Sequence, residues 1–263
     1  MSPTPSKVPT IFSPARAHQR RRRMLTGKRD GQASFVLDEA VDDIIERLAF
    51  VRHEPACSLI LGDTSMQLGR KFAEHGGQVM LADIVGYFDH FAFDLEQPYP
   101  QSGFDFIAVL GLLDGVNDLP GALIHMRNAL TPGGMMIASF VGGGSLPQLR
   151  SAMLAADGDR PAARMHPLVD PRAAPGLLQR AGWKDPVVDT HRLTARYSSL
   201  DRLVKDLREQ GLTNALSDTA SPLSKAALTR ARSAFLDQAD ADGKVSETFE
   251  IITLTGRRSL AGS

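Results

Sequence analysis

Residues 58–66 read Ser-Leu-Ile-Leu-Gly-Asp-Thr-Ser-Met. The short apolar run at 58–61 is typical of a buried strand, and Gly62 marks its end. Residues 65–75 then have the pattern of a helix, which Gly76 and Gly77 would terminate. A buried strand that leads directly into a helix predicts one unit of a parallel α/β sheet.

The same alternation continues along the chain. Other apolar runs predict strands at 78–82, 104–110, 135–141, 186–190 and 249–254. Helical patterns cover 34–52, 118–130, 172–181 and most of 198–240. This spacing predicts a doubly wound parallel sheet, with a ligand crevice outside the carboxyl ends of the first strands. The crevice would bring together the turn at 62–66, Asp83, Asp94 and the segment after Leu110.

The composition is that of an ordinary globular protein and excludes several kinds of site. Of the 263 residues, 43% are hydrophobic and 23% are charged, and no stretch approaches the roughly 20 apolar residues of a membrane span. The single cysteine, Cys57, permits neither an internal disulfide nor metal-finger spacing, and it suits a reducing compartment. The seven histidines include no pair four residues apart, and no G-x-S-x-G elbow is present. We therefore predict no metal site and no serine-hydrolase site.

The charge is balanced overall but unevenly distributed. Residues 1–29 hold eight of the 30 basic residues and none of the 30 acidic residues, so the rest of the chain carries a net charge of −8. This start is typical of a transit peptide, of an arm that meets nucleic acid or anionic lipid, or of a helical arm that packs on an acidic body. We expect a basic N-terminal arm at 1–33 and one domain at 34–263, and we expect deletion of 1–29 to leave the fold intact but alter partner binding.

Several motifs in a fixed order carry a family resemblance. They lie at 116–123 (VNDLPGAL), 130–134 (LTPGG), 143–150, 206–208, 214–216 and 248–256. In this combination the chain resembles the class I S-adenosylmethionine-dependent methyltransferases. The branch it is most like contains the malonyl-acyl-carrier-protein methyltransferase of biotin synthesis and a mitochondrial complex I assembly factor. The resemblance implies a seven-stranded Rossmann-like sheet whose last strand is antiparallel, with a helical lid at about 195–245.

The resemblance also implies a cofactor, S-adenosylmethionine, and residues to bind it. Gly62 and Asp63 stand in the turn that approaches the cofactor. Asp83 follows the second strand, where the family uses an acid to bind the ribose hydroxyls. Asp94 and Leu95 match the loop that holds the adenine. No catalytic residue is predicted, because methyl transfer mainly requires two reactants held in line in a dry pocket.

Two departures from the family pattern put cofactor binding in doubt. The family's turn reads Asp-Leu-Gly-Cys-Gly-x-Gly, whereas here Thr64 and Met66 replace glycines that let the backbone approach a ligand. The same residues also fit a capped helix start, with Thr64 as N-cap and Gln67 at N3. After the fourth strand the branch has His-Trp, and this chain has Asp114-Gly115.

Two functions remain open at this level. The first is a methyltransferase with a degraded cofactor motif, which passes a methyl group to a small-molecule or protein acceptor under the lid. The second is a catalytically inactive protein that binds or assembles a protein partner, such as a respiratory-complex subunit, through the lid and the basic arm. Nucleic acid is not the expected partner. We expect a cytoplasmic location, with the mitochondrial matrix as the alternative.

Overall fold

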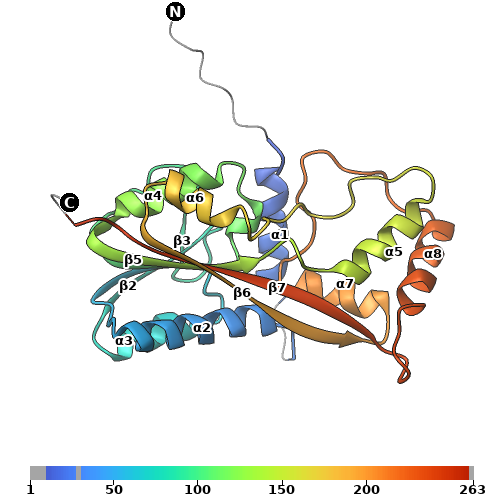
Figure 1. Cartoon of the computed structure of the whole chain (residues 1–263), viewed down its shortest axis with the longest axis horizontal. Helices are drawn as coiled ribbons and strands as arrows, with labels where there is room; N and C mark the ends of the chain where they lie inside the picture. The colour runs from blue at the N-terminus through green and yellow to red at the C-terminus, as the bar shows by residue number, and fades with distance from the viewer. Residues whose placement is uncertain (1–9, 28–30, 261–263) are drawn as a thin grey trace, which may run out of the picture.

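The computed structural model describes residues 10–27 and 31–260. In this part of the chain, one seven-stranded sheet has the order β3-β2-β1-β4-β5-β7-β6 (Figure 1). The strands are β1 (Cys57–Leu61), β2 (Gln78–Asp83), β3 (Phe91–Ala92), β4 (Phe104–Leu110), β5 (Leu130–Val141), β6 (Lys184–Tyr197) and β7 (Val245–Arg257). The helices are α1 (Pro14–Thr26), α2 (Phe35–Val51), α3 (Gln67–Glu74), α4 (Leu119–Ala129), α5 (Pro147–Asp157), α6 (Ala174–Arg180), α7 (Leu200–Glu209) and α8 (Lys225–Leu236), with a 3-10 turn, η1, at Leu113–Gly115.

The strand directions confirm the predicted fold class. Strands β3, β2, β1, β4 and β5 run parallel, and β7 runs antiparallel to both β5 and β6. The chain moves outward from β1 to β2 and β3 and then returns to place β4 on the other side of β1. Such a reversal opens a crevice at the carboxyl ends of the strands.

Several strand predictions need correction. Strands β5 and β7 begin at Leu130 and Val245, before the predicted 135 and 249. Strand β3 was not predicted, because two residues are too short to show a pattern. Strand β6 extends well beyond the predicted 186–190, because its antiparallel ladder with β7 continues as far as Tyr197 opposite Val245. Its buried and exposed residues alternate, so it lacks the continuous apolar run of the parallel strands.

Helices cover both faces of the sheet. Residues of α2 and α3 pack with Ile60 and Phe106 on one face, and residues of α4 and α6 pack with Leu59 and Leu61 on the other. Successive residues of β1 thus enter different cores, as the two-residue period of a strand requires. Figure 1 shows α2 and α3 below the sheet and α4 and α6 above it.

The lid expected before the last strand lies between β6 and β7 and carries α7 and α8. A third cluster of buried side chains joins these helices to α5, to the C-terminal end of β6 and to the N-terminal half of β7. The prediction that 198–240 is mainly helical is wrong for 210–224. Helix α7 ends before Gly211, whose φ is +68°, and the following segment instead pairs with the N-terminal segment through Ala215 and Ser217.

The N-terminal basic segment contains α1, which packs on the body of the protein at α7 (Figure 1). The described part of the predicted arm therefore contains a helix that packs on the body of the protein, which is one of the alternatives expected from its charge. Residues 1–9 and 28–30 lie outside the described residues. The boundary at 33/34 stays a prediction. Across the described ranges, no helix combines the length and apolar character needed to cross a bilayer.

The different burial of two phenylalanine side chains predicts different losses of stability when each is replaced by alanine. Phe106 of β4 is completely buried and meets Phe72 edge-on at a ring-centroid distance of 5.7 Å. We expect Phe106→Ala to lower the free energy of unfolding by about 3–5 kcal/mol, because the cavity loses apolar contacts on every side. Urea unfolding measures this change. Phe91→Ala, at a side chain that is 59% exposed, is the matched control and should change little. Equal losses for the two variants would contradict this view of the core.

Candidate functional site

The crevice at the carboxyl ends of β1, β2 and β4 contains two cavities that meet at α1. One cavity has a volume of about 300 Å³ and the other about 360 Å³. Arg21 of α1 and Gly111, which follows β4, line both. The side chain of Arg21 therefore stands between the two halves of the crevice.

Arg21 is held there by a charge-assisted contact to the end of β2. Its Nε donates to both carboxylate oxygens of Asp83, at 3.1 and 3.0 Å, and its Nη2 donates to Oδ2 at 2.7 Å. The same Nη2 also donates to the carbonyl oxygen of Gly62 at 3.0 Å. Arg21 is 6% exposed and Asp83 is fully buried. A planar guanidinium on a carboxylate is among the strongest polar contacts in proteins, so two of the predicted cofactor residues already have a partner within the chain.

Asp63, the next residue of the turn, serves the start of α3. Its Oδ2 accepts the backbone N–H of Gly69 at 3.0 Å, and its Oδ1 accepts the hydroxyl of Ser65 at 2.8 Å. Asp63 is completely buried. The predicted capping box at Thr64 and Gln67 is therefore wrong, because the helix begins only at Gln67 and the carboxylate of Asp63 satisfies a donor of its first turn.

The backbone of the turn is constrained at two positions. Gly62 has φ of +88°, and a Cβ placed there would lie 2.3 Å from the carbonyl oxygen of Leu110. The surviving glycine is thus needed for contact with β4. Met66 also has a left-handed backbone, with φ of +59°, although it carries a side chain. Thr64, the other position where the family pattern has a glycine, is not among the residues with positive φ.

Asp94 and Leu95 line the 360 Å³ cavity together with Arg21. Asp94 is exposed, and its side chain accepts the backbone N–H of Glu96 at 3.0 Å. Leu95 is 3% exposed and belongs to the core between the sheet and α4. The structure thus brings four of the five predicted residues to the crevice, whereas Asp63 is directed to α3. Their roles toward a cofactor stay predictions.

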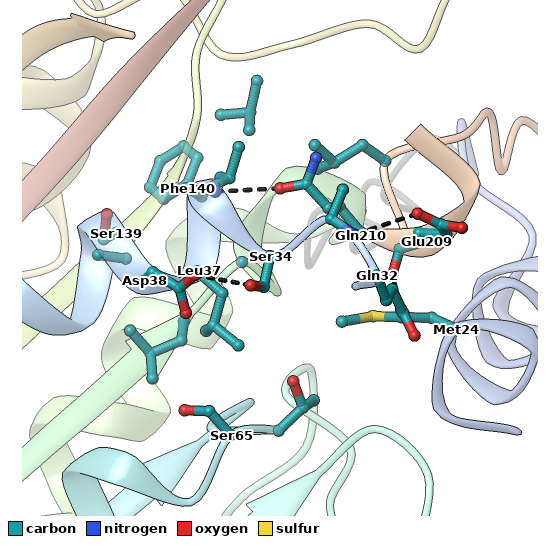
Figure 2. A pocket seen from close by; sticks show the side chains of 18 of the residues that line it. Met24, Gln32, Ser34, Leu37, Asp38, Ser65, Ser139, Phe140, Glu209 and Gln210 are labelled. Carbon is teal, nitrogen blue, oxygen red and sulfur yellow. Dashed lines mark hydrogen bonds between the residues drawn. The ribbon is translucent and has the colours of Figure 1, made fainter. Parts of the chain in front are cut away.

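The 300 Å³ cavity has walls from several distant parts of the chain, among them α1, the start of α2, the turn after β1, the ends of β4 and β5, and the end of α7. Figure 2 shows Ser34 and Asp38 of the α2 start, Ser65 of the turn, and Glu209 and Gln210 at the end of α7 around it. Gln210 Oε1 accepts the backbone N–H of Val36 at 3.0 Å, so the lid is joined to α2 across the cavity. Any ligand that entered would lie between the lid and the sheet.

Residues that follow β4 bind the N-terminal segment. Asn117 Oδ1 accepts the backbone N–H groups of Ile11 and Phe12, each at 2.8 Å, and its Nδ2 donates to the carbonyl oxygen of Phe12 at 3.1 Å. The ring of Phe12 stacks on His166 with centroids 4.6 Å apart. Helix α1 is therefore anchored at its start as well as at Arg21.

Asp114, at the position of the branch's His-Trp pair, lies beside these contacts and is 4% exposed. Its Oδ2 is 3.5 Å from Arg20 Nη1 and 3.6 Å from His166 Nε2. Burial lowers the pKa of His166 below its ordinary value of 6.5, although the charge of Asp114 opposes this effect. His166 is thus neutral at neutral pH, and Arg20 supplies the nearby positive charge.

Sequence reasoning missed Arg21 and Asn117. Four consecutive arginines, 20–23, give no indication of which one is buried. The available signal was the small residue Ala17 four positions earlier, which is buried on the same face of α1. Among the described residues no group of three or more His, Cys, Asp or Glu side chains could hold a metal ion.

The sheet order, the antiparallel last strand β7 and the crevice define the fold of the class I S-adenosylmethionine-dependent methyltransferases. The 1,6-didemethyltoxoflavin-N1-methyltransferase of Burkholderia thailandensis, solved with 1,6-didemethyltoxoflavin and S-adenosylhomocysteine, superposes with a TM-score of 0.52. The two chains are 15% identical, over 97% of this chain and 94% of that one.

Sequence comparisons confirm the resemblance to the malonyl-acyl-carrier-protein methyltransferase branch. The chain is 28% identical over 192 residues to malonyl-[acyl-carrier protein] O-methyltransferase 1 of Coxiella burnetii. This alignment covers 67% of this chain and 64% of that protein. It is also 28% identical over 164 residues to the mitochondrial arginine-hydroxylase NDUFAF5 of Rattus norvegicus. This alignment covers 60% of this chain and 48% of that protein. The chain thus spans about half to just under two thirds of the length of these relatives. No family model matches it.

The left-handed backbone at Met66 predicts that a glycine variant is more stable than an alanine variant at this position. Met66→Gly should be more stable than Met66→Ala by about 1 kcal/mol, because both variants lose the side chain but only glycine adopts positive φ without a steric cost. Thermal or urea unfolding of the two variants measures the difference. A Met66→Ala variant as stable as Met66→Gly would show that the turn is not strained.

The lowered pKa of His166 predicts a dependence of stability on pH. As the pH falls through about 6.5, the unfolded chain takes up a proton that the folded chain resists, so the free energy of unfolding decreases. His166→Gln removes this protonation and should reduce the loss between pH 7 and pH 5. His75→Gln, at an exposed histidine, is the control and should follow the parent protein. An unchanged pH dependence in His166→Gln would contradict the expectation.

Proposed function

We propose that this chain is a methyltransferase-like protein whose own N-terminal helix closes the cofactor site, and that it acts as a binding or assembly factor. The observation that carries the proposal is the pairing of Arg21 with Asp83. In the family that the chain resembles, the acid at this position binds the ribose hydroxyls of S-adenosylmethionine. Here it receives three hydrogen-bond contacts from a guanidinium.

The turn supports the same conclusion. A cofactor that approached it would meet the carbonyl oxygen of Gly62 already bound to Arg21, and Asp63 engaged with α3. Displacing Arg21 without replacing its charge would leave Asp83 as an unpaired buried carboxylate, which typically costs about 3–5 kcal/mol. A neutral ribose supplies hydroxyl donors but no positive charge, so it is a weaker partner for Asp83 than Arg21 is.

The partner surface we propose is the outer side of α1 with the adjoining lid. Arg16, Arg22 and Arg23 are exposed on α1 while Arg21 faces the crevice. The segment before α1 is joined to the lid through Ala215 and Ser217. These contacts change our expectation for the N-terminal deletion, because loss of α1 removes the partner of buried Asp83. We now expect the deletion to lower stability as well as partner binding.

Methyl transfer is the second candidate function, and one observation favours it. Cavities of about 300 and 360 Å³ flank Arg21, and the second is lined by Asp94 and Leu95. Withdrawal of α1 would join them. S-adenosylmethionine bound there would supply an electrophilic methyl group, Asp83 would hold its ribose, and an acceptor would enter under the lid.

Isothermal titration with S-adenosylhomocysteine separates the two candidates. We expect the parent protein to show no micromolar binding. Arg21→Ala combined with Thr64→Gly and Met66→Gly should bind measurably, because Asp83 is then free and the turn regains its glycines. Arg22→Ala, which removes an exposed arginine from the same helix, is the matched control for Arg21→Ala.

Micromolar binding to the parent protein would overturn the proposal and support methyl transfer. Binding by Arg21→Ala alone would mean that the helix, and not the altered turn, closes the site. Binding by the variant with only the two glycines restored would mean that the turn closes it, and the proposal that Arg21 does so would fail.

A further inference from the structure

Three large apolar side chains that are exposed to solvent lie together at the end of α2. Phe50 and Val51, in the last turn of this helix, are 89% and 42% exposed, and Val187 of β6 is 48% exposed. They line a groove of about 360 Å³ together with Met135 and Ile137 of β5, which are buried. We call this feature the Phe50 groove. Apolar side chains that gather at a surface mark interaction sites, whereas single ones need no explanation.

The ring of Phe50 takes no part in the core of the protein. The apolar face of α2 consists of residues such as Val41, Ile44 and Leu48, which are buried against the sheet. Phe50 lies on the outer face of the same helix, one turn beyond exposed Glu46. Covering an exposed ring removes apolar surface from water and is therefore favourable. The ring is available for a contact outside the chain.

The polar residues at the rim of the groove already pair with one another. Arg47 Nε donates to Asp43 Oδ1 at 2.8 Å, and its Nη1 donates to Asp189 Oδ2. Asp43 Oδ2 also accepts the hydroxyl of Thr253 at 2.8 Å. Glu46 lines the groove as well and has no ion pair among the described residues. This excess of carboxylates disfavours an anionic lipid surface or an acidic partner. The surface that remains to be covered is apolar.

The strand beside the groove is not suited to pairing with a strand of another chain. Strand β6 is the outer strand of the sheet, but Pro186 near its start has no backbone N–H to donate. The register with β7 shifts between Lys184 and Val187, and Asp185 has a left-handed backbone with φ of +48°. Prolines and bulges of this kind keep sheet edges from adding strands. A partner at this place therefore docks through side chains.

The groove and the ring beside it are complementary to each other. A cavity of about 150 Å³ with apolar walls accommodates a benzene ring, so the Phe50 groove has room for a second phenylalanine ring. In a two-fold symmetric dimer, a feature on one side of the axis meets the feature that lies equally far on the other side. An axis between Phe50 and the groove thus places the ring of each copy in the groove of the other.

We propose that a second copy of this chain docks on the Phe50 groove, so that the protein forms a two-fold symmetric dimer in which each Phe50 ring enters the partner's groove. A small apolar surface of this kind predicts a weak dimer that dissociates in the micromolar range.

The dimer lies beyond the proposed function and does not depend on it. Helix α2 begins beside the 300 Å³ cavity, which Ser34 and Val36 line. A rise of about 1.5 Å per residue puts Phe50 roughly 20 Å farther along the helix. Neither α1 nor the residues around Asp83 take part in the contact.

Sedimentation equilibrium of the full chain between about 1 and 100 µM tests the proposal. We expect a dimer that forms as the concentration rises. Phe50→Ser removes the ring and Val187→Ser removes an apolar wall, so each should raise the dissociation constant at least about tenfold. Phe88→Ser is the matched control, because Phe88 is 94% exposed but lies in the loop after β2. It should dimerise like the parent protein.

A parent protein that stays monomeric at about 100 µM would overturn the proposal. Equal weakening of the dimer by Phe50→Ser and Phe88→Ser would also overturn it, because the association would then be non-specific. Circular dichroism and the melting temperature establish that each variant is folded. If Val187→Ser does not fold, the variants at Phe50 and Phe88 still decide the proposal.

A tryptophan at position 50 reports whether this ring becomes covered. The fluorescence of Phe50→Trp should shift to shorter wavelength as the dimer forms, because the ring leaves water. Trp183 is 5% exposed and gives a background that the control Phe88→Trp shares. The control should show no shift. Dimer formation without a shift in Phe50→Trp would mean that the copies meet elsewhere, and the proposal would fail.

Titration of Phe50→Ser with S-adenosylhomocysteine separates this result from the proposed closure of the cofactor site. We expect the variant and the parent protein to give the same titration, because the groove and the crevice lie at opposite ends of α2. Failure of the dimer therefore leaves the pairing of Arg21 with Asp83 untouched, and failure of the closure leaves the dimer untouched.

Discussion

The pairing of Arg21 with Asp83 is the contact on which the arrangement of the crevice depends. It joins a helix from the start of the chain to the end of β2 and, through the carbonyl oxygen of Gly62, to the end of β1. Both charges are almost completely buried, so each requires the other. The position of α1, the division of the crevice into two cavities and the access of any ligand all follow from this pair.

The turn after β1 makes its polar contacts within the chain. Glycines in such a turn usually let the backbone meet a ligand, whereas here Gly62 meets Leu110 and the carboxylate of Asp63 stabilises the start of α3. Met66 retains the left-handed backbone of a glycine without being one. The polar groups of this turn are thus directed to contacts within the chain.

The N-terminal segment and the lid form one cover over the crevice. Asn117 holds the start of this segment, Ala215 and Ser217 pair with it, and Arg20 reaches the carbonyl oxygen of Thr213. Loop and terminal segments of this kind commonly carry the function of a rigid scaffold.

The sequence by itself determined the alternation of strands and helices, the antiparallel last strand expected from the family resemblance, and a crevice with Asp83 and Asp94 beside it. Those features follow from local periodicity and from the rule that parallel strands end at one edge. Only the tertiary structure decided that Arg21 and not its neighbours enters the crevice and that Asp63 turns toward α3. The contact between Arg21 and Asp83 joins residues 62 positions apart in the sequence. No local pattern specifies which of several similar side chains becomes buried.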